Sequence, residues 1–444
     1  MTRYPRKKYV VFGSLVAVCV LLLGAACAAQ EPQEGLESSQ EDTHGYVAGA
    51  QEKPEAQLHL VVVDGANSLS LFDLATEEIK PLGDLSGITA ITTDGRYIFA
   101  ADSRNELTVL DSGAWTVDHG DHLHHYLAQP RTVGSVAGLG AGAARVASSS
   151  VLTVVQSEAS GEVTLFDSAA LGSGEIERVA EIKQDGASGS DNSSGMNESF
   201  EPGGEPGIGS ESRGGAVSVL SSRILAGVPS ATGEINGVQA YDDAGNELPG
   251  QQAECLALEG GITTRAGAVF GCENGVLFAT VRTGEPVAFG FLPYPEGTSK
   301  MHRVREFHGR PGRPTVAAVA GDSGAWVINV RTRELSLIPT EQPLLQVVAA
   351  DNSGGQLVAL TSDGTVQVLD ALTGAVLAST EPILAETMGE RELAHLPNLI
   401  ILEKRAYVNA PAEGVIYEID YEDSARISRT IDNMSDPRFL VGVG

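Results

Sequence analysis

The chain has 444 residues, of which 42% are hydrophobic, and this is enough to bury a core of considerable size. Acidic residues outnumber basic ones by 58 to 29, so the formal net charge is −29. This balance excludes a nucleic-acid-binding protein, whose contacts with phosphates require a basic surface, and it is typical of a soluble exported protein.

Residues 1–27 are predicted to be a signal peptide with a lipobox-like end. Basic side chains precede an apolar run over 9–23, which is shorter than the about 20 residues that a membrane-spanning helix needs. Gly24-Ala25-Ala26-Cys27 resembles the lipobox of bacterial lipoproteins, although Gly24 stands where a large aliphatic residue is usual. We expect lipidation at Cys27 and membrane contact only through this anchor, with ordinary cleavage around 26–28 as the alternative. Either way the protein is exported, to the outer face of the cell membrane or a periplasm-like space.

Residues 28–57 are predicted to be a disordered acidic tether. The segment is rich in Glu, Gln, Gly and Ser and contains very few apolar side chains. Such a composition cannot bury enough surface to offset the entropy of ordering the chain.

One pattern recurs over 58–444 and predicts a single all-β domain, a β-propeller. A turn rich in Asn, Asp, Ser and Gly leads into an alternating strand, at a period of roughly 40 to 50 residues. The repeated units lie at 67–73, 105–111, 160–167, 236–242, 274–280, 323–329, 363–370 and 413–420. They predict eight blades of mostly four-stranded antiparallel sheets, with seven blades as an alternative. Two β-sandwiches would not explain the even spacing.

A histidine-rich run follows the second unit and is the strongest candidate for chemistry. Four of the nine histidines lie within seven residues, interleaved with aspartates: Asp118, His119, Asp121, His122, His124 and His125. Imidazole and carboxylate are ligands that Zn²⁺ favours. In an extended segment His122 and His124 share a face, and His119 can join them if Gly120 reverses the chain. Two alternatives stay open: an ordinary polar loop, and a set in which only some histidines are ligands.

Residues 184–215 interrupt the repeat with Gly, Ser, Asn and Glu. We interpret this stretch as a low-complexity loop between blades, more readily a tolerated insertion than a recognition loop, because it has almost no large apolar anchor.

The two cysteines of the predicted domain, Cys255 and Cys272, are expected to form a disulfide, since an even pair in an exported protein favours one. The residues between them read as two strands around Gly260-Gly261, which the disulfide would close. Metal ligation by the thiols is the alternative.

Further ligands can come from distant blades, because propeller loops converge at the mouth of a central channel. His302, His308 and Glu259 are the candidates for such additional metal contacts.

The stretch 111–134 resembles the AztD family of exported zinc metallochaperones. The resemblance is carried by Trp115-Thr-Val-Asp-His-Gly-Asp-His122 with Tyr126, Pro130 and Arg131, and it extends over the propeller. It implies a β-propeller that delivers Zn²⁺ to the solute-binding protein of a zinc ABC importer. It further implies His119, His122 and His124 as zinc ligands, with His125 and Asp121 next.

The function that we expect from these observations is zinc transfer by ligand exchange, by a monomer and without catalysis. Two other classes stay open: an interaction scaffold without a specific metal, and a zinc-dependent hydrolase or lactonase, because propellers also carry enzymes.

Overall fold

A computed structural model of the chain describes residues 47–119, 122–140, 142, 144–157, 161–183, 215–230, 234–390, 397–434 and 436–444. The chain divides into two compact units, Met1–His44 and Gly45–Gly444, and every described residue belongs to the second. The predicted signal peptide, the lipidation site Cys27, most of the tether and nearly all of the insertion 184–215 lie outside the described residues. Within the described part of the chain, every helix is too short or too polar to traverse a bilayer.

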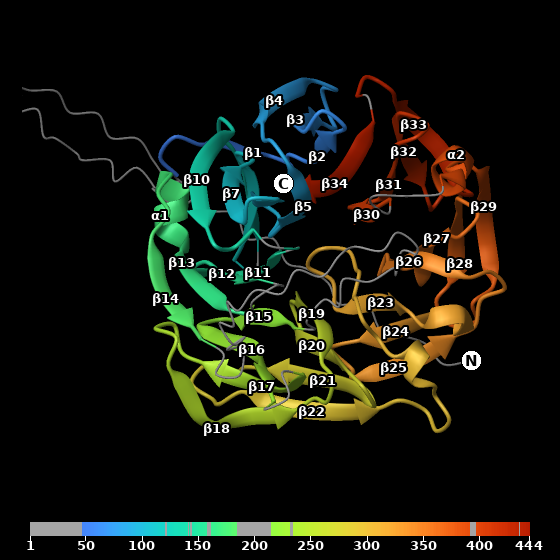
Figure 1. Ribbon diagram of the computed structural model, residues 1–444. Coiled ribbons are helices and arrows are strands. Elements are labelled where there is room, and N and C mark those ends of the chain that lie inside the picture. The colour runs from blue at the N-terminus through green and yellow to red at the C-terminus, as the bar shows by residue number, and fades with distance from the viewer. Residues whose placement is uncertain are drawn as a thin grey trace, which may run out of the picture. The chain divides into compact units, whose positions relative to one another are not determined.

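The second unit is a β-propeller of eight blades, as the repeat predicts (Figure 1). Seven blades have four antiparallel strands and one has three, and a further small sheet lies outside the blades. The first blade joins the two ends of the propeller. It consists of β34 (Pro437–Val443), β2 (His59–Asp64), β3 (Ser68–Asp73) and β4 (Ile79–Asp84), in that order across the sheet.

The next four blades follow the chain. The second consists of β5 (Ile88–Thr93), β6 (Tyr97–Asp102), β7 (Glu106–Asp111) and β10 (Arg131–Ala137). The third consists of β11 (Ala144–Ser148), β12 (Leu152–Ser157), β13 (Val163–Asp167) and β14 (Arg178–Ile182). The fourth consists of β15 (Val217–Leu220), β16 (Arg223–Pro229), β17 (Ile235–Tyr241) and β18 (Glu247–Glu254). The fifth consists of β19 (Glu259–Thr264), β20 (Gly267–Cys272), β21 (Gly275–Thr280) and β22 (Ala288–Pro293).

The last three blades complete the ring. The sixth consists of β23 (Thr315–Val319), β24 (Ala325–Asn329) and β25 (Glu334–Ile338). The seventh consists of β26 (Leu344–Ala349), β27 (Gln356–Thr361), β28 (Thr365–Asp370) and β29 (Val376–Pro382). The eighth consists of β30 (Leu399–Leu402), β31 (Arg405–Ala410), β32 (Val415–Asp420) and β33 (Arg426–Ile431). The short helices are α1 (Ser168–Ser173), α2 (Ala385–Gly389), η1 (Lys300–His302) and η2 (Gly321–Ser323).

The remaining sheet contains β1 (Gln51–Lys53), β9 (Leu123–Leu127) and β8 (Ala114–Asp118). Strand β1 lies inside the segment 28–57 that the composition predicts to be disordered. The prediction is wrong for these three residues, because their backbone pairs with β9, a strand that lies far along the chain. Polar composition alone does not show such a partner.

Aspartates at the ends of strands shape the turns that follow. Asp64 accepts hydrogen bonds from the backbone N–H of Ala66 and of Ser68, both at 2.8 Å. Asp102 and Asp242 accept equivalent bonds from the N–H groups two and four residues ahead. These bonds satisfy donors that the sheet leaves unpaired, and Asp73 and Asp370, which close two of the repeated units, accept bonds of the same kind.

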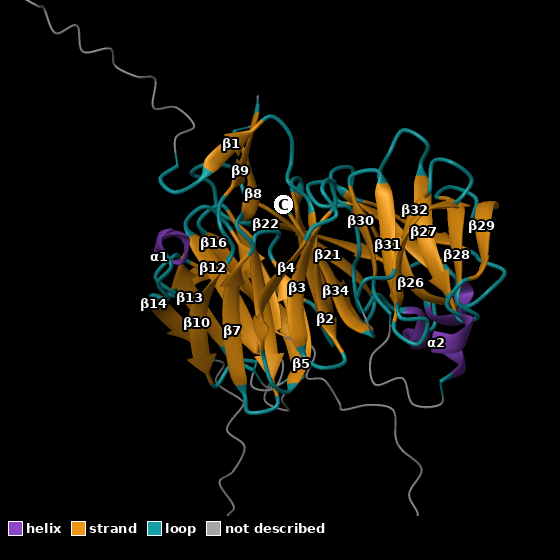
Figure 2. Cartoon of the chain, turned by 90° about the horizontal axis from the view of Figure 1, so that it is seen from above, coloured by secondary structure: helices purple, strands orange, loops and turns teal. Residues whose placement is uncertain are grey.

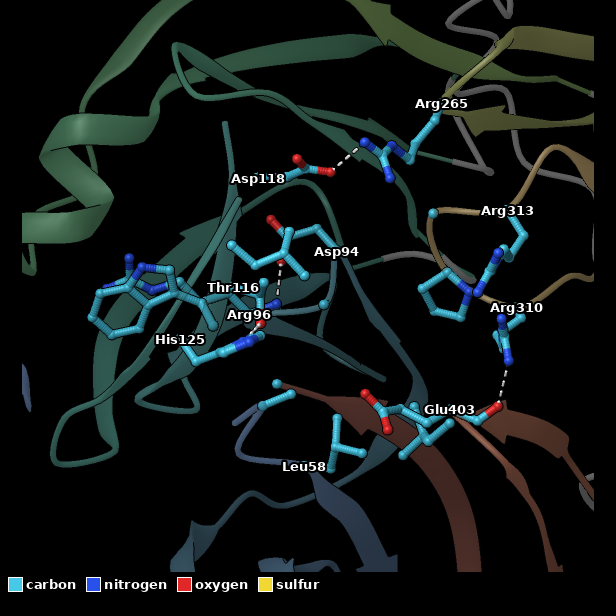
Figure 3. A pocket seen from close by; sticks show the side chains of 18 of the residues that line it. Leu58, Asp94, Arg96, Thr116, Asp118, His125, Arg265, Arg310, Arg313 and Glu403 are labelled. Atoms are coloured by element: carbon cyan, nitrogen blue, oxygen red, sulfur yellow. Dashed lines mark hydrogen bonds and ion pairs between the residues drawn. The ribbon is translucent and has the colours of Figure 1, made fainter. Parts of the chain in front are cut away.

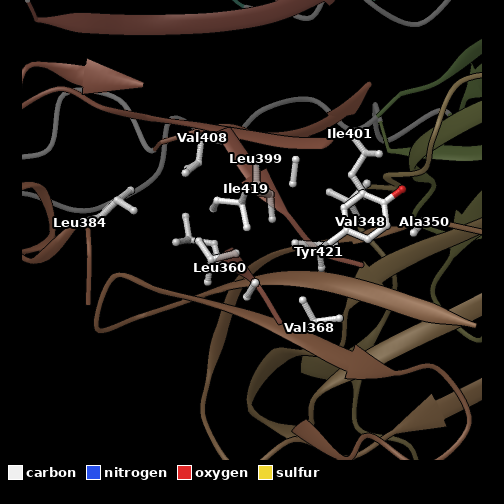
Figure 4. Packing of buried hydrophobic residues seen from close by; sticks show 14 of the residues in the cluster. Val348, Ala350, Leu360, Val368, Leu384, Leu399, Ile401, Val408, Ile419 and Tyr421 are labelled. Carbon is white, nitrogen blue, oxygen red and sulfur yellow. The ribbon is translucent and has the colours of Figure 1, made fainter. Parts of the chain in front are cut away.

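Each pair of neighbouring blades shares an apolar core, and Figure 4 shows the one between blades seven and eight. Val348 and Leu360 from blade seven pack with Val408, Ile419 and Tyr421 of blade eight, each at most 2% exposed. Burying such a side chain stabilises the fold by about 1.5–3 kcal/mol. Successive side chains of a strand point to opposite faces of the blade, so each face packs against one of the two neighbouring blades.

Cys255 and Cys272 form the predicted disulfide. The two strands between them are β19 and β20, but their turn lies at 265–266 and not at Gly260-Gly261. Gly260 instead forms a bulge within β19, with a φ of 66°. A Cβ atom there would lie 2.1 Å from the carbonyl oxygen of Arg305, so the site requires glycine.

Arg429 connects the last blade to the first. Its guanidinium pairs with the buried carboxylate of Glu418 and donates to the carbonyl oxygen of Leu74, 3.2 Å away, and to Glu77. Burial alone would raise the pKa of Glu418, but hydrogen bonds from Ser428 and Arg429 hold it below the ordinary value of 4.5. A carboxyl group whose pKa is lowered by folding stabilises the folded state at pH values above its ordinary pKa. This contribution is lost as the pH falls through the lowered pKa.

Replacing Arg429 by Met is expected to lower the free energy of unfolding by about 2 kcal/mol at pH 7, because a buried carboxylate loses its cation. The loss is expected to shrink as the pH falls from the ordinary glutamate pKa of 4.5 toward the lowered pKa of Glu418, because the natural protein then loses the contribution of the ionised carboxylate. Urea unfolding at pH 7 and at a pH below 4.5 measures the effect, and Arg331→Met, in an exposed turn of blade six, is the control. An equal loss at both pH values would contradict the assignment.

Removing the disulfide as Cys255→Ala/Cys272→Ala is expected to lower the free energy of unfolding by about 3 kcal/mol, because the unfolded chain regains the freedom of a closed loop. The bond spans 17 residues in sequence. Urea unfolding with and without reductant checks it. Reductant should lower the free energy of unfolding of the natural chain by the same amount and leave that of the variant unchanged. A decrease of less than about 1 kcal/mol on removal of the disulfide would contradict the prediction.

Candidate metal centre

The histidine run forms a β-hairpin that is inserted into blade two. Strand β8 pairs with β9 from Ala114↔Leu127 to Asp118↔Leu123, and the hairpin lies in sequence between β7 and β10 of that blade. Strand β1 adds to the free edge of β9, with Glu52 opposite Tyr126. Figure 2 shows the three short strands at one face of the ring, beyond the ends of the blades.

An arginine of blade two holds the base of the hairpin in place. Arg96 binds the carboxylate of Asp111 with two hydrogen bonds of 3.1 and 2.9 Å. The same guanidinium lies 3.8 Å from the centre of the Trp115 ring, which in turn stacks on Tyr126 at 5.1 Å. A planar guanidinium can make both contacts at once, so the hairpin is joined to the blade by charge and by stacking.

Three imidazoles gather at the tip of this hairpin. The ring centres of His119, His122 and His124 lie 4.8–5.2 Å apart. The Nε2 atoms of His122 and His124 are 2.9 Å from one another. The backbone N–H of His119 donates to the backbone carbonyl oxygen of His122 at 3.0 Å. The turn therefore brings together the three residues that the sequence singles out first.

A carboxylate from β1 contacts the most buried of the three histidines. Oε1 of Glu52 lies 2.6 Å from Nδ1 of His124, whose residue is 8% exposed. A carboxylate on one ring nitrogen fixes the tautomer and leaves the other nitrogen as a ligand atom, an arrangement that is common behind metal-bound histidines. Sequence reasoning missed Glu52, because it is one of many acidic residues in a segment without a pattern.

The cluster is close to, but not arranged as, a complete coordination shell. Two histidine nitrogens that bind one Zn²⁺ at about 2.0–2.1 Å in a tetrahedral site lie about 3.3 Å apart, so the 2.9 Å between His122 and His124 must widen slightly. Among the described residues, no group of three or more His, Cys, Asp or Glu side chains has the geometry of a preformed metal site. Asp121, the predicted oxygen ligand in the turn, lies outside the described residues.

His125 lies on the opposite side of the hairpin from His124, because neighbouring residues in a strand face opposite ways. Its Nδ1 is 2.9 Å from the hydroxyl of Thr116, and its ring lines a cavity beside the hairpin (Figure 3). Asp118 faces the same cavity and pairs with Arg265 at 2.6 Å. The structure therefore places the ring of His125 on the other side of the hairpin from His124.

The predicted additional ligands have partners of their own. His302 lies 2.7 Å from Asp322, and Glu259 is paired with Arg303 and Arg305. His308 lines a second cavity, of about 380 Å³, among the inner strands of the ring. The structure does not assign these three residues to one site.

The solved structures that resemble this chain show its fold. The crystal structure of AztD from Citrobacter koseri superposes with a TM-score of 0.66 at 16% identity, covering 87% of this chain and 97% of the other. The structure of the apo form of the same protein superposes with a TM-score of 0.66 at 16% identity, covering 88% of this chain and 99% of the other. The dihydro-heme d1 dehydrogenase NirN gives 0.50 at 13% identity, with 86% and 75% covered.

Neither a protein-family model nor a curated protein sequence matches the chain. Because AztD and a dehydrogenase resemble the same chain in fold, fold alone does not assign an activity. The comparisons therefore show that this chain has a β-propeller fold of the AztD type.

Proposed function

We propose that this chain is an exported zinc-binding metallochaperone that hands Zn²⁺ to the solute-binding protein of a zinc ABC importer. The observation that carries the proposal is the cluster of His119, His122 and His124 with Glu52 behind it. Three neutral imidazoles with a carboxylate on one of them make a donor set that suits Zn²⁺. The N-terminal signal and lipobox-like residues support export, and Asp121 is available in sequence as a fourth ligand.

The position of the cluster favours transfer over storage. His119 and His122 are exposed at the tip of a hairpin that stands at one face of the ring, whereas His124, one pair further along the hairpin, is buried. Ligands of an acceptor can thus replace the two outer histidines one at a time while the inner one still holds the ion. Such stepwise exchange avoids the release of free Zn²⁺.

An enzymatic role is less well supported by the same geometry. A zinc hydrolase holds its metal in a pocket where the substrate fits, with an open coordination position and a base. The cavity of about 670 Å³ beside the hairpin is lined by His125, and not by His119, His122 or His124. We therefore propose no catalytic function. A scaffold without a metal role would predict that the three histidines are dispensable.

Replacing His119, His122 and His124 together by Ala is expected to remove one equivalent of bound Zn²⁺, because the tip then lacks its nitrogen donors. Zinc is measured by elemental analysis after loading and desalting. His125→Ala, on the other side of the same hairpin, is the matched control and should keep the full content. Equal zinc in the triple variant and the natural chain would refute the site.

Replacing Glu52 by Gln is expected to weaken zinc binding by about 10–100-fold, because His124 loses the carboxylate that orients its ring. Competition with a chromophoric chelator gives the affinity. Glu55→Gln removes the same charge three residues away and is expected to leave the affinity unchanged. If both variants weaken binding alike, the effect comes from the general charge of the segment and not from the contact with His124.

The transfer itself is tested by mixing the zinc-loaded chain with a metal-free zinc solute-binding protein. The acceptor is expected to gain zinc faster than an excess of a small chelator removes it, because exchange passes through a complex of the two proteins. If zinc reaches the acceptor only as fast as it dissociates spontaneously, the protein binds zinc but does not act as a chaperone.

A further inference from the structure

The cavity beside the hairpin carries an excess of basic side chains in a chain that is strongly acidic. Its volume is about 670 Å³, within the range of small-molecule sites. Five basic side chains line it, Arg96, Arg265, Arg310, Arg313 and Lys404, against three acidic side chains, Asp94, Asp118 and Glu403, and the terminal residue Gly444. The chain as a whole has a net charge of −29, so this local balance runs against the rest of the molecule.

The lining residues come from turns at one face of the ring. Arg96 follows the turn between β5 and β6, Arg265 lies between β19 and β20, and Lys404 lies between β30 and β31. Arg310 and Arg313 belong to the loop that precedes β23. Figure 3 shows these two arginines across the cavity from the hairpin residues Thr116 and His125. The blades thus direct basic side chains from distant parts of the sequence toward one space.

Several of these charges already have partners, and others do not. Arg96 is bound to Asp111 and Arg265 to Asp118, while Arg310 donates to the carbonyl oxygen of Glu403 at 2.8 Å. Within the described part of the chain, neither the Arg313 nor the Lys404 side chain has a hydrogen bond or an ion pair.

Asp94 does little to neutralise these cations. Its carboxyl group accepts hydrogen bonds from Ser148 and from the backbone N–H of Arg96 and Tyr97. Removal of this group from water raises the pKa of Asp94, against the effect of those bonds. The carboxyl group is thus engaged with the wall of the cavity, and Arg313 and Lys404 are left facing the interior.

We infer that this cavity binds a small oxyanion that carries at least two negative charges, a polycarboxylate or a phosphate. Guanidinium groups bind both in a two-pronged manner, and an excess of positive charge in a cleft attracts anions. The Arg310–Arg313 loop supplies cations on one side, and Thr116 and His125 supply polar groups on the other. This site is independent of the zinc cluster, because it uses the opposite side of the hairpin and requires no metal.

The test is calorimetric titration of the metal-free chain with tricarballylate and with pyrophosphate, at constant ionic strength, beside monovalent acetate. Both divalent or trivalent probes are expected to bind at least about tenfold more tightly than acetate, since a second charge reaches a second cation. The tighter of the two identifies the ligand as carboxylate or phosphate.

Arg313→Gln and Lys404→Gln are each expected to weaken the tighter probe by about tenfold, the effect of losing one charge-assisted contact. Arg331→Gln removes the same charge from an exposed turn of blade six and should leave binding unchanged. Thermal unfolding verifies that all three variants are folded. Absence of saturation by either probe, or an equal loss in Arg331→Gln, would overturn the inference.

Discussion

The antiparallel pairing of β34 with β2 joins the last strand of the chain to the first blade, and the closed ring depends on it. Val441 lies opposite Val61 in this pairing, and the sheet then continues outward through β3 and β4. A blade completed by strands from both ends leaves no open seam where sheet edges or apolar faces would meet water. Arg429 adds a polar connection across the same junction, from blade eight to the residues that follow β3.

The ring gives the hairpin of β8 and β9 its role. Inserted between the third and fourth strands of blade two, the hairpin cannot bury a core of its own, because isolated two-stranded sheets are at best marginally stable. It is held by β1 along one edge and by Arg96 under Trp115 at its base. These contacts order the base and leave His119 and His122 exposed at the tip, as the proposed exchange of metal requires.

The two sides of this hairpin separate two kinds of chemistry. One side holds the imidazoles of the tip and Glu52, where neutral nitrogen donors and a carboxylate suit a cation. The other side presents Thr116 and His125 to a cavity whose far wall is rich in arginine. A single alternating strand can serve both because successive side chains point in opposite directions. The chain as a whole carries a net charge of −29, so the excess of basic side chains in this cavity runs against the rest of the sequence.

The sequence by itself determined the propeller, the disulfide partners and the grouping of His119, His122 and His124, because these follow from local rules. Alternation, turn chemistry and the spacing of residues in a hairpin all act over a few residues. Only the tertiary structure decided that Glu52 stands behind His124 and that Arg310 and Arg313 face the hairpin. Those contacts join residues tens to hundreds of positions apart, and their placement depends on how the blades close into a ring, which no local pattern in the chain records.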